Sequence, residues 1–169
     1  MTNSMLFTYT RNYKFPVQTV WEALIEMHEL LQWWSPKNLS LVNASLDFRL
    51  GGQFHYGMQT PDGQEMWGKF IYREIEEEKR ISFLSFFSDQ EGRVTRHPVS
   101  PNWPAEMLNE IRLTEKESST ELQFLAMPFK ASEEEILTFN QSAYQLEKGF
   151  AVTFEQLNDW LLQKNAAWN

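Results

Sequence analysis

The side chains of this 169-residue sequence that could bind a metal ion lie far apart along the chain. Its three histidines, His28, His55 and His97, form neither an H-x-H nor an H-x-x-x-H pair. A metal site needs several ligands that converge on one ion, and the sequence encodes no such group locally. We therefore predict no metal site. His55 stands between Phe54 and Tyr56, so it is expected on the opposite side of a strand from these rings.

Motifs for nucleophilic catalysis and phosphate binding are also missing. No G-x-S-x-G segment occurs, and the absence of cysteine excludes thiolate nucleophiles, disulfides and thiolate zinc sites. Gly51-Gly52 fits neither phosphate-binding glycine motif, and a tight turn with positive φ explains it better. Glu65, Glu74 and Glu110 could act as general bases only beside a converging partner. We predict no catalytic residues and no cofactor, and favour a binding protein over an enzyme.

Two groups of charged residues each allow two interpretations. Glu110 and Arg112 share one face of a strand, either as buried groups that need partners or as a cross-strand pair on the solvent face, and the second is favoured. Arg93, Arg96 and His97 lie in one loop, either as an anion site or as solvated residues, and again the second is favoured. The formal charge of −8 opposes binding to nucleic acids and membrane surfaces, so neither partner is expected.

Aromatic residues are the strongest candidates for a binding role. They make up 15% of the sequence, either as an aromatic core alone or partly as the lining of a cavity for an apolar ligand. Trp33 and Trp34 are adjacent, so on a helix one can pack in the core while the other lies near a cavity mouth. The residues expected to line the cavity are Trp34, Phe54, Tyr56, Met58, Phe70, Phe83, Trp103, Phe124, Phe150 and Phe154.

Hydrophobic patterns predict the elements that would position these side chains. A strand over residues 6–13 precedes a helix that begins at Phe15-Pro16 and a short helical turn over 28–34. Residues 132–163 form one long amphipathic helix of roughly 45–50 Å, with Ser132 and Glu135 at capping-box spacing. Between these parts, alternation predicts six strands, over 41–50, 53–59, 65–75, 80–87, 106–115 and 120–128.

Asp89 to Pro104 is the one long irregular segment, and it carries Trp103. A loop of about 15 residues is often functional, so a functional loop and a lid-like loop pinned for stability alone both stay open. The element order predicts an α+β fold in which a curved antiparallel sheet surrounds the C-terminal helix and leaves an apolar gap. Residues 1–169 are expected to form one domain, with a core over about 6–163. No signal or transmembrane segment is recognised, and a cytoplasmic protein is expected.

Five motifs stand in an order that is typical of one known superfamily. They are V-W-E-A-L within Val17–Leu24, Trp33-Trp34-Ser35-Pro36, Asp47–Gly52, Gly68–Ile75, and Gly149-Phe150 with Leu157–Leu162. Together they resemble the START-like (SRPBCC) superfamily, and in particular its branch of activator of heat-shock protein 90 ATPase homologues. Phe150 departs from the family pattern, which usually has Trp there. The resemblance implies the helix-grip fold, in which a curved sheet holds a long helix above an internal cavity, and implies little about activity.

Three functions fit these observations. The first is a protein that binds a small hydrophobic or amphipathic ligand in the cavity, as the aromatic strands and the resemblance suggest. The second is a chaperone-accessory role in the stress response, with a chaperone as partner, and it rests on the resemblance alone. The third is an enzyme acting on a hydrophobic substrate, as in the polyketide cyclases of the superfamily, which a polar pair pointing into the cavity would favour. Ligand identity and oligomeric state, including a homodimer, are left open.

Overall fold

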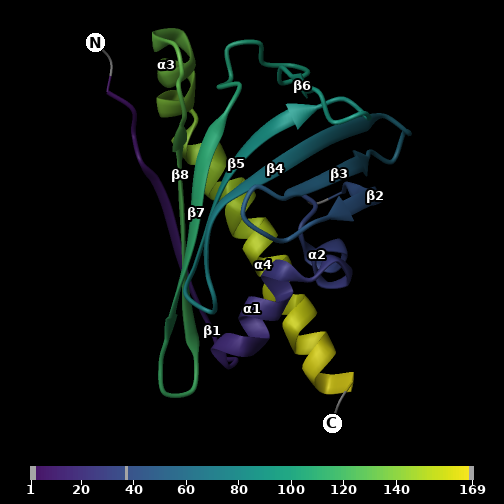
Figure 1. Cartoon of the computed structure of the whole chain (residues 1–169), viewed down its shortest axis with the longest axis vertical. Helices are drawn as coiled ribbons and strands as arrows, with labels where there is room; N and C mark the ends of the chain where they lie inside the picture. Colours follow the sequence, from purple (N-terminus) through teal and green to yellow (C-terminus); the bar gives the residue numbers. More distant parts are fainter. Residues whose placement is uncertain (1–2, 37, 168–169) are drawn as a thin grey trace.

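The strands and helices follow one another in an order that gives an α+β fold, as predicted. The computed structural model describes residues 3–36 and 38–167 (Figure 1). Its helices are α1 (Val17–Ile25), α2 (Met27–Trp33), α3 (Glu133–Gln141) and α4 (Ala143–Ala167). Its strands are β1 (Phe7–Tyr13), β2 (Ser40–Leu46), β3 (Gln53–Gln59), β4 (Glu65–Glu76), β5 (Arg80–Ser88), β6 (Val94–Thr95), β7 (Met107–Glu115) and β8 (Thr120–Pro128).

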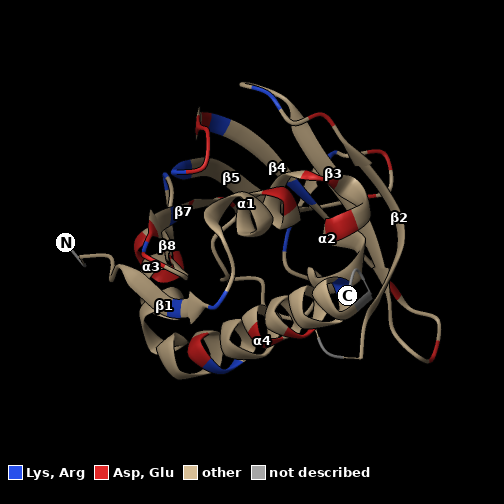
Figure 2. Cartoon of the chain, turned by 90° about the horizontal axis from the view of Figure 1, so that it is seen from below, with Lys and Arg blue, Asp and Glu red and all other residues tan. Residues whose placement is uncertain are grey.

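The strands of the described ranges belong to one curved antiparallel sheet. Its order is β1-β8-β7-β5-β4-β3-β2, and the two-residue strand β6 pairs with β5 outside this path. Figure 2 shows the sheet as an arc, with α4 across the open side of the arc and α1 and α2 between them. The apolar side chains of the concave face and of the three helices therefore share one core. The helix-grip arrangement that the resemblance implies is confirmed.

The C-terminal helical region is two helices, so the prediction of one continuous helix over 132–163 is wrong. The capping box at its start is present, because Glu135 N donates to Ser132 Oγ and Ser132 N donates to Glu135 Oε2, both at 3.2 Å. The break falls at Ser142, whose backbone N donates to Phe139 O and whose hydroxyl donates to Thr138 O at 2.8 Å. A hydroxyl that bonds back to the preceding turn competes with the helical ladder and bends the chain.

Strand β2 ends at Leu46, whereas the alternation predicted a strand as far as residue 50. The chain turns over 47–52, where Gly52 N donates to Arg49 O at 2.8 Å. Gly51 has the predicted positive φ, at +76°. A Cβ on Gly52 would lie 2.0 Å from Asp47 O, so close backbone approach requires the second glycine.

Residues 89–104 are less irregular than predicted. Asp89 Oδ1 accepts the backbone N–H groups of Glu91 and Arg93 at 3.0 and 2.8 Å, which closes a tight turn after β5. The chain then returns to pair Val94 and Thr95 with the end of β5. A two-residue strand is too short to produce a visible alternation, so sequence analysis had no signal for β6.

Three polar contacts stand out among those that hold α4 against the rest of the fold. The buried Tyr13 hydroxyl donates to Phe154 O at 2.8 Å, and burial raises its pKa well above the usual value. Gln156 Nε2 donates to Ser35 O at 2.6 Å, which binds the chain just after α2 to α4. The third contact, which we call the Glu29 cluster, consists of Glu29 with its partners Lys164 and Trp160.

The Glu29 cluster is a buried charged group between α2 and the C-terminal half of α4. Glu29 is 1% exposed. Its carboxylate accepts hydrogen bonds from Trp160 Nε1 and from Lys164 Nζ, and the lysine also lies 3.8 Å from Glu22 Oε2. A carboxylate this deeply buried is tolerated only because both of its oxygens have partners. The cluster therefore fixes the position of the helix relative to α1 and α2.

Candidate functional site

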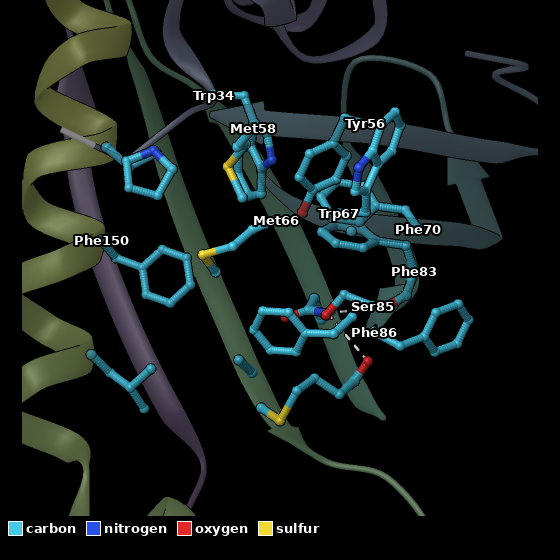
Figure 3. Close-up of a pocket in the computed structure, with 18 of the residues that line it drawn as sticks. Trp34, Tyr56, Met58, Met66, Trp67, Phe70, Phe83, Ser85, Phe86 and Phe150 are labelled. Carbon is cyan, nitrogen blue, oxygen red and sulfur yellow. Dashed lines mark hydrogen bonds between the residues drawn. The ribbon is translucent and has the colours of Figure 1, made fainter. Parts of the chain in front are cut away.

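A pocket of about 290 Å³ lies between the concave face of the sheet and α4 (Figure 3). Small-molecule sites typically measure about 300–1,000 Å³, so this pocket is at the lower end of that range. Its described lining is apolar apart from a few uncharged polar groups. It consists of Trp34, Pro36, Leu39, Tyr56, Met58, Met66, Trp67, Gly68, Phe70, Phe83, Ser85, Phe86, Phe87, Trp103, Pro104, Met107, Asn109, Phe124, Ala126, Leu146, Phe150 and Thr153.

The periodicities of strand and helix explain which side chains of β3 and α4 reach the pocket. On β3, Tyr56 and Met58 point inward, whereas His55 contacts the ring of Trp67. On α4 the lining residues Leu146, Phe150 and Thr153 recur every three or four positions, so they form one stripe that faces the sheet. Figure 3 shows Phe150 projecting from the helix toward the side chains of the strands.

Contacts between aromatic rings give the pocket its walls. Phe70 of β4 and Phe83 of β5 stack with ring centroids 4.2 Å apart. Trp34 meets Phe70 edge to face at 5.2 Å, and on the opposite wall Phe124 of β8 lies 4.5 Å from Phe150 of α4. Such contacts stabilise the rings beyond their burial alone, by about 0.5–1.5 kcal/mol per pair. The walls are therefore held in place without a ligand.

The adjacent tryptophans have the different environments that their helical spacing allows. Trp33 is 1% exposed, and its Nε1 donates to Ala23 O at 2.9 Å. Trp34 is the residue that lines the pocket.

Eight of the ten residues predicted to line a cavity do line this pocket, and Phe54 and Phe154 lie behind its wall. Both are 0% exposed. Phe54 packs against the rings of Tyr56 and Phe70, at 4.8 and 5.4 Å. Phe154, one turn beyond Phe150 on α4, stacks on Tyr9 of β1 at 5.4 Å. These two phenylalanines support the lining residues and do not form part of the surface themselves.

Sequence analysis missed three polar residues of the lining, which are Ser85, Asn109 and Thr153. Asn109 is 5% exposed, and its Nδ2 donates to Ser85 Oγ at 2.9 Å. The signal for Asn109 was present in the sequence, because Glu110 and Arg112 were placed on the solvent face of this strand. The residue between Glu110 and Leu108 therefore belonged on the inner face, where a polar side chain is the exception.

Glu110 and Arg112 form the solvent-facing pair that was favoured over a buried one. Glu110 also binds Arg80 of the neighbouring strand, and both nitrogen–oxygen distances are 3.1 Å. Partial burial acts to raise the pKa of Glu110, but hydrogen bonds from both arginines outweigh it and lower the pKa below its usual value.

Tyr56 reaches its place in the pocket because Gly68 is opposite it on β4. A Cβ at Gly68 would lie 2.6 Å from Tyr56 Oη, so the ring occupies the room that a side chain would fill. Gly57 and Trp67 form the reciprocal pair, in which a Cβ on the glycine would lie 2.8 Å from the indole. Burial raises the pKa of Tyr56 to about 12, although a hydrogen bond with Trp34 opposes the shift. Tyr56 is therefore a neutral hydroxyl at neutral pH.

The loop that carries Trp103 to the pocket is organised around His97. The His97 ring lies 4.8 Å from the ring of Phe87 and 6.4 Å from that of Trp103. Its Nδ1 accepts the backbone N–H groups of Val99 and Ser100, both at 3.1 Å. These bonds require a neutral imidazole, since a protonated Nδ1 cannot accept.

Another contact ties the loop to α3. Arg96 Nη1 lies 2.5 Å from Glu135 Oε1, and Trp103 packs on Phe139 with ring centroids 5.8 Å apart. Arg96 is therefore an anchor for the loop as well as a partly solvated side chain.

Acidification is expected to destabilise this loop. Burial lowers the pKa of His97 below its ordinary value of 6.5, so below that pH the unfolded chain binds a proton that the folded chain does not. The stability contributed by neutral His97 is present above pH 6.5 and is lost as the pH falls below it. The midpoint temperature of thermal unfolding should fall more between about pH 7.5 and about pH 5.5 in the natural protein than in the His97→Asn variant. Asparagine keeps an acceptor for Val99 N but does not titrate.

Equal falls in the two proteins would contradict this assignment. Arg96, the sequence neighbour of His97, and its partner Glu135 are present in both proteins, so the comparison isolates the change at position 97.

The remaining candidate groups do not converge in the described part of the chain. No cluster of three or more histidine, aspartate or glutamate side chains is placed to hold a metal ion there. His28 lies on α2, His55 on β3 and His97 in the loop after β6. Among the described helices, none combines the length and apolar character needed to cross a bilayer.

Comparison with known proteins identifies relatives of the whole fold. A crystal structure of a protein from Nitrosomonas europaea is 26% identical and has a TM-score of 0.75, covering 98% of this chain and 99% of that chain. A solution NMR structure of a protein from Arthrobacter aurescens is 22% identical with a TM-score of 0.76, covering 95% and 87%. A Rhodobacter sphaeroides structure is 15% identical with a TM-score of 0.75 and 96% coverage of each chain. The comparison with proteins that have curated descriptions found no match.

The sequence also matches one family model over most of its length, at residues 14–161. The match includes four of the five motifs on which the resemblance was based in full, beginning with the V-W-E-A-L helix, and the fifth motif as far as Leu161 of α4. The chain belongs to the family of activator of Hsp90 ATPase homolog 1-like proteins within the START-like superfamily.

Proposed function

We propose that this protein binds a small hydrophobic or amphipathic molecule in the pocket between the sheet and α4. The observation that carries the proposal is an apolar space of about 290 Å³ whose described lining contains no charged residue. Binding of an apolar molecule there would remove its surface from water, at a gain of about 25 cal/mol per Å².

The size of the pocket supports a ligand more than a packing defect. Protein interiors are close-packed, with few voids larger than one water molecule, whereas this space measures about 290 Å³. Apolar groups that line an unfilled void lose attractive contacts. The aromatic walls nevertheless keep the space open through their own ring contacts, such as Phe70 with Phe83 and Phe124 with Phe150.

Native mass spectrometry after incubation with a hydrophobic metabolite extract is expected to reveal a bound molecule. The variant Leu146→Trp should lose the adduct, because Leu146 lines the pocket from α4 and the larger ring would fill it. The matched control is Val152→Trp, an equal enlargement on the same helix at a residue that is 39% exposed and outside the lining. Retention of the adduct by Leu146→Trp, or absence of any adduct from the natural protein, would count against the proposal.

Circular dichroism must accompany this comparison, since overpacking typically costs about 1–3 kcal/mol. Loss of the adduct is informative only when the Leu146→Trp variant keeps the spectrum and a cooperative unfolding transition.

An enzymatic role has less support from the pocket. The polar pair that could have favoured an enzyme is present as Ser85 and Asn109, but neither side chain titrates near neutral pH. The described lining residue with a titratable side chain is Tyr56, whose pKa of about 12 keeps it protonated. General acid–base catalysis needs a group with a pKa near the working pH. The described lining is therefore better suited to binding than to proton transfer.

A chaperone-accessory role is the second candidate, and the family match is the observation that favours it. The direct test is the ATPase rate of the cognate Hsp90-type chaperone with and without this protein. An unchanged rate at saturating protein would remove this role and would leave the proposal of ligand binding intact. The cytoplasmic location and the absence of nucleic-acid and membrane partners stay predictions.

A further inference from the structure

The Ser85–Asn109 pair breaks the otherwise apolar lining of the sheet side of the pocket. Ser85 lies on β5 and Asn109 on the adjacent β7, and both line the pocket. Figure 3 shows Ser85 beside Phe83 and Phe86, across the pocket from Phe150. Burying an amide in an apolar wall is unfavourable unless its hydrogen bonds are made, so its remaining capacity indicates what it can bind.

The amide nitrogen of Asn109 is fully used within the protein. Nδ2 donates to Ser85 Oγ at 2.9 Å and to the backbone oxygen of Met107 at 3.2 Å, with Phe83 O at 3.4 Å. Three acceptors around one nitrogen fix the orientation of the amide group. Oδ1 is therefore turned away from these partners and has no donor among the described residues. Because no fully buried side-chain oxygen there lacks a partner, Oδ1 must keep some accessible surface.

Ser85 has a complementary unused group. Its Oγ accepts the Asn109 N–H, and its own O–H proton has no acceptor among the described residues. The pair consequently offers one acceptor, Asn109 Oδ1, next to one donor, the Ser85 hydroxyl. A ligand hydroxyl can satisfy both, because it donates to Oδ1 and accepts from Ser85. A ligand carbonyl can accept from Ser85.

An ionised ligand fits this pair poorly. A carboxylate would place its negative charge beside the partial negative charge of Asn109 Oδ1, and the described lining holds no lysine, arginine or histidine to neutralise it. Removing an unpaired carboxylate from water costs far more than one hydrogen bond returns. The pair and the uncharged lining around it therefore favour a neutral ligand over an ionised one.

We infer that Ser85 and Asn109 form the recognition site for the polar end of the ligand, and that the ligand is a neutral amphipathic molecule with a hydroxyl or carbonyl group. This inference rests on the proposed binding function and specifies the class of molecule bound. The apolar part of the ligand would contact the aromatic walls, and its neutral polar end would meet the pair.

The test is calorimetric binding of decanol and decanoate at about pH 7.5, two probes with the same chain length and different polar ends. The natural protein should bind decanol at least about tenfold more tightly than decanoate. Ser85→Ala should weaken decanol binding about three- to tenfold, which corresponds to the loss of one hydrogen bond. The matched control is Ser82→Ala, since Ser82 is a buried serine of the same strand outside the lining, and it should bind decanol like the natural protein.

Asn109→Leu supplies a second variant, which removes the acceptor and should also weaken decanol binding. Ser85→Ala keeps the Asn109 bond to Met107 O, so the test survives if Asn109→Leu does not fold. Equal affinity for decanol and decanoate, with no effect of Ser85→Ala, would overturn the inference and leave ligand binding in place. Failure to bind either probe would also overturn it, and the proposed function would fail as well only if the metabolite extract gave no adduct.

Discussion

Replacing Glu29 with alanine should lower the free energy of unfolding by about 3–5 kcal/mol, the usual cost of removing one partner from a buried ion pair. The carboxylate is 1% exposed and satisfies both Lys164 Nζ and Trp160 Nε1. Its removal leaves the Trp160 indole N–H without its acceptor and leaves the Lys164 ammonium group only the more distant carboxylate of Glu22, at 3.8 Å. Urea denaturation followed by circular dichroism would measure the change.

A double-mutant cycle separates the ion pair from the rest of the Glu29 cluster. Glu29→Ala with Lys164→Met should be less destabilising than the sum of the two single changes, because the double variant no longer holds an unpaired charge. Glu29→Gln is the conservative control, since an amide oxygen can still accept from Trp160. A loss below about 1 kcal/mol for Glu29→Ala would show that the cluster behaves as a surface pair.

Phe154→Ala should be the other severe variant, with a loss of about 3–5 kcal/mol in the free energy of unfolding. Phe154 is 0% exposed and lies between the rings of Tyr9, Trp33 and Phe124. Truncation there opens a cavity enclosed on every side. Phe150→Ala, one turn away, should cost only about 1–2 kcal/mol, near the transfer free energy of the lost surface, because that ring already borders the pocket.

Together, the Phe150→Ala and Phe154→Ala variants test whether Phe150 lines the pocket while Phe154 is packed behind the lining. Similar losses for Phe150→Ala and Phe154→Ala in chemical denaturation would mean that both rings are core residues and that the pocket is closed in solution. Ligand binding gives an independent measurement, since Phe150→Ala changes the pocket surface whereas Phe154→Ala acts through stability alone.

Much of the fold could be predicted because its signals are local. Alternation marks a strand wherever one face is buried, and the helix over residues 17–25 repeats its apolar residues at helical spacing. The capping box at Ser132 was readable for the same reason. The break at Ser142 was not, because the apolar stripe runs through it and a hydroxyl that bonds back to Thr138 leaves no mark on the pattern.

The pocket lining was harder to predict, since the depth at which a side chain lies behind the pocket surface depends on the curvature of the sheet as well as on the alternation of residues. The pattern placed Phe54 and Phe154 on the correct faces, but it could not tell a ring that borders a void from one packed behind it. Glu29 shows a related limit. A glutamate in a short helix is expected to be exposed to solvent. The burial of Glu29 depends on Lys164 and Trp160, which are more than 130 positions away in the sequence.

The reciprocal packing of Tyr56 over Gly68 and of Trp67 over Gly57 has a consequence for how this sheet can evolve. Each ring occupies the volume of a missing side chain on the neighbouring strand, so the residue types at the two positions of a pair constrain each other. A mutation that gives position 68 a side chain is tolerated only after position 56 has lost its ring, and the order of the two steps is constrained. A side chain can therefore be gained at position 57 or 68 only through paired substitutions across β3 and β4.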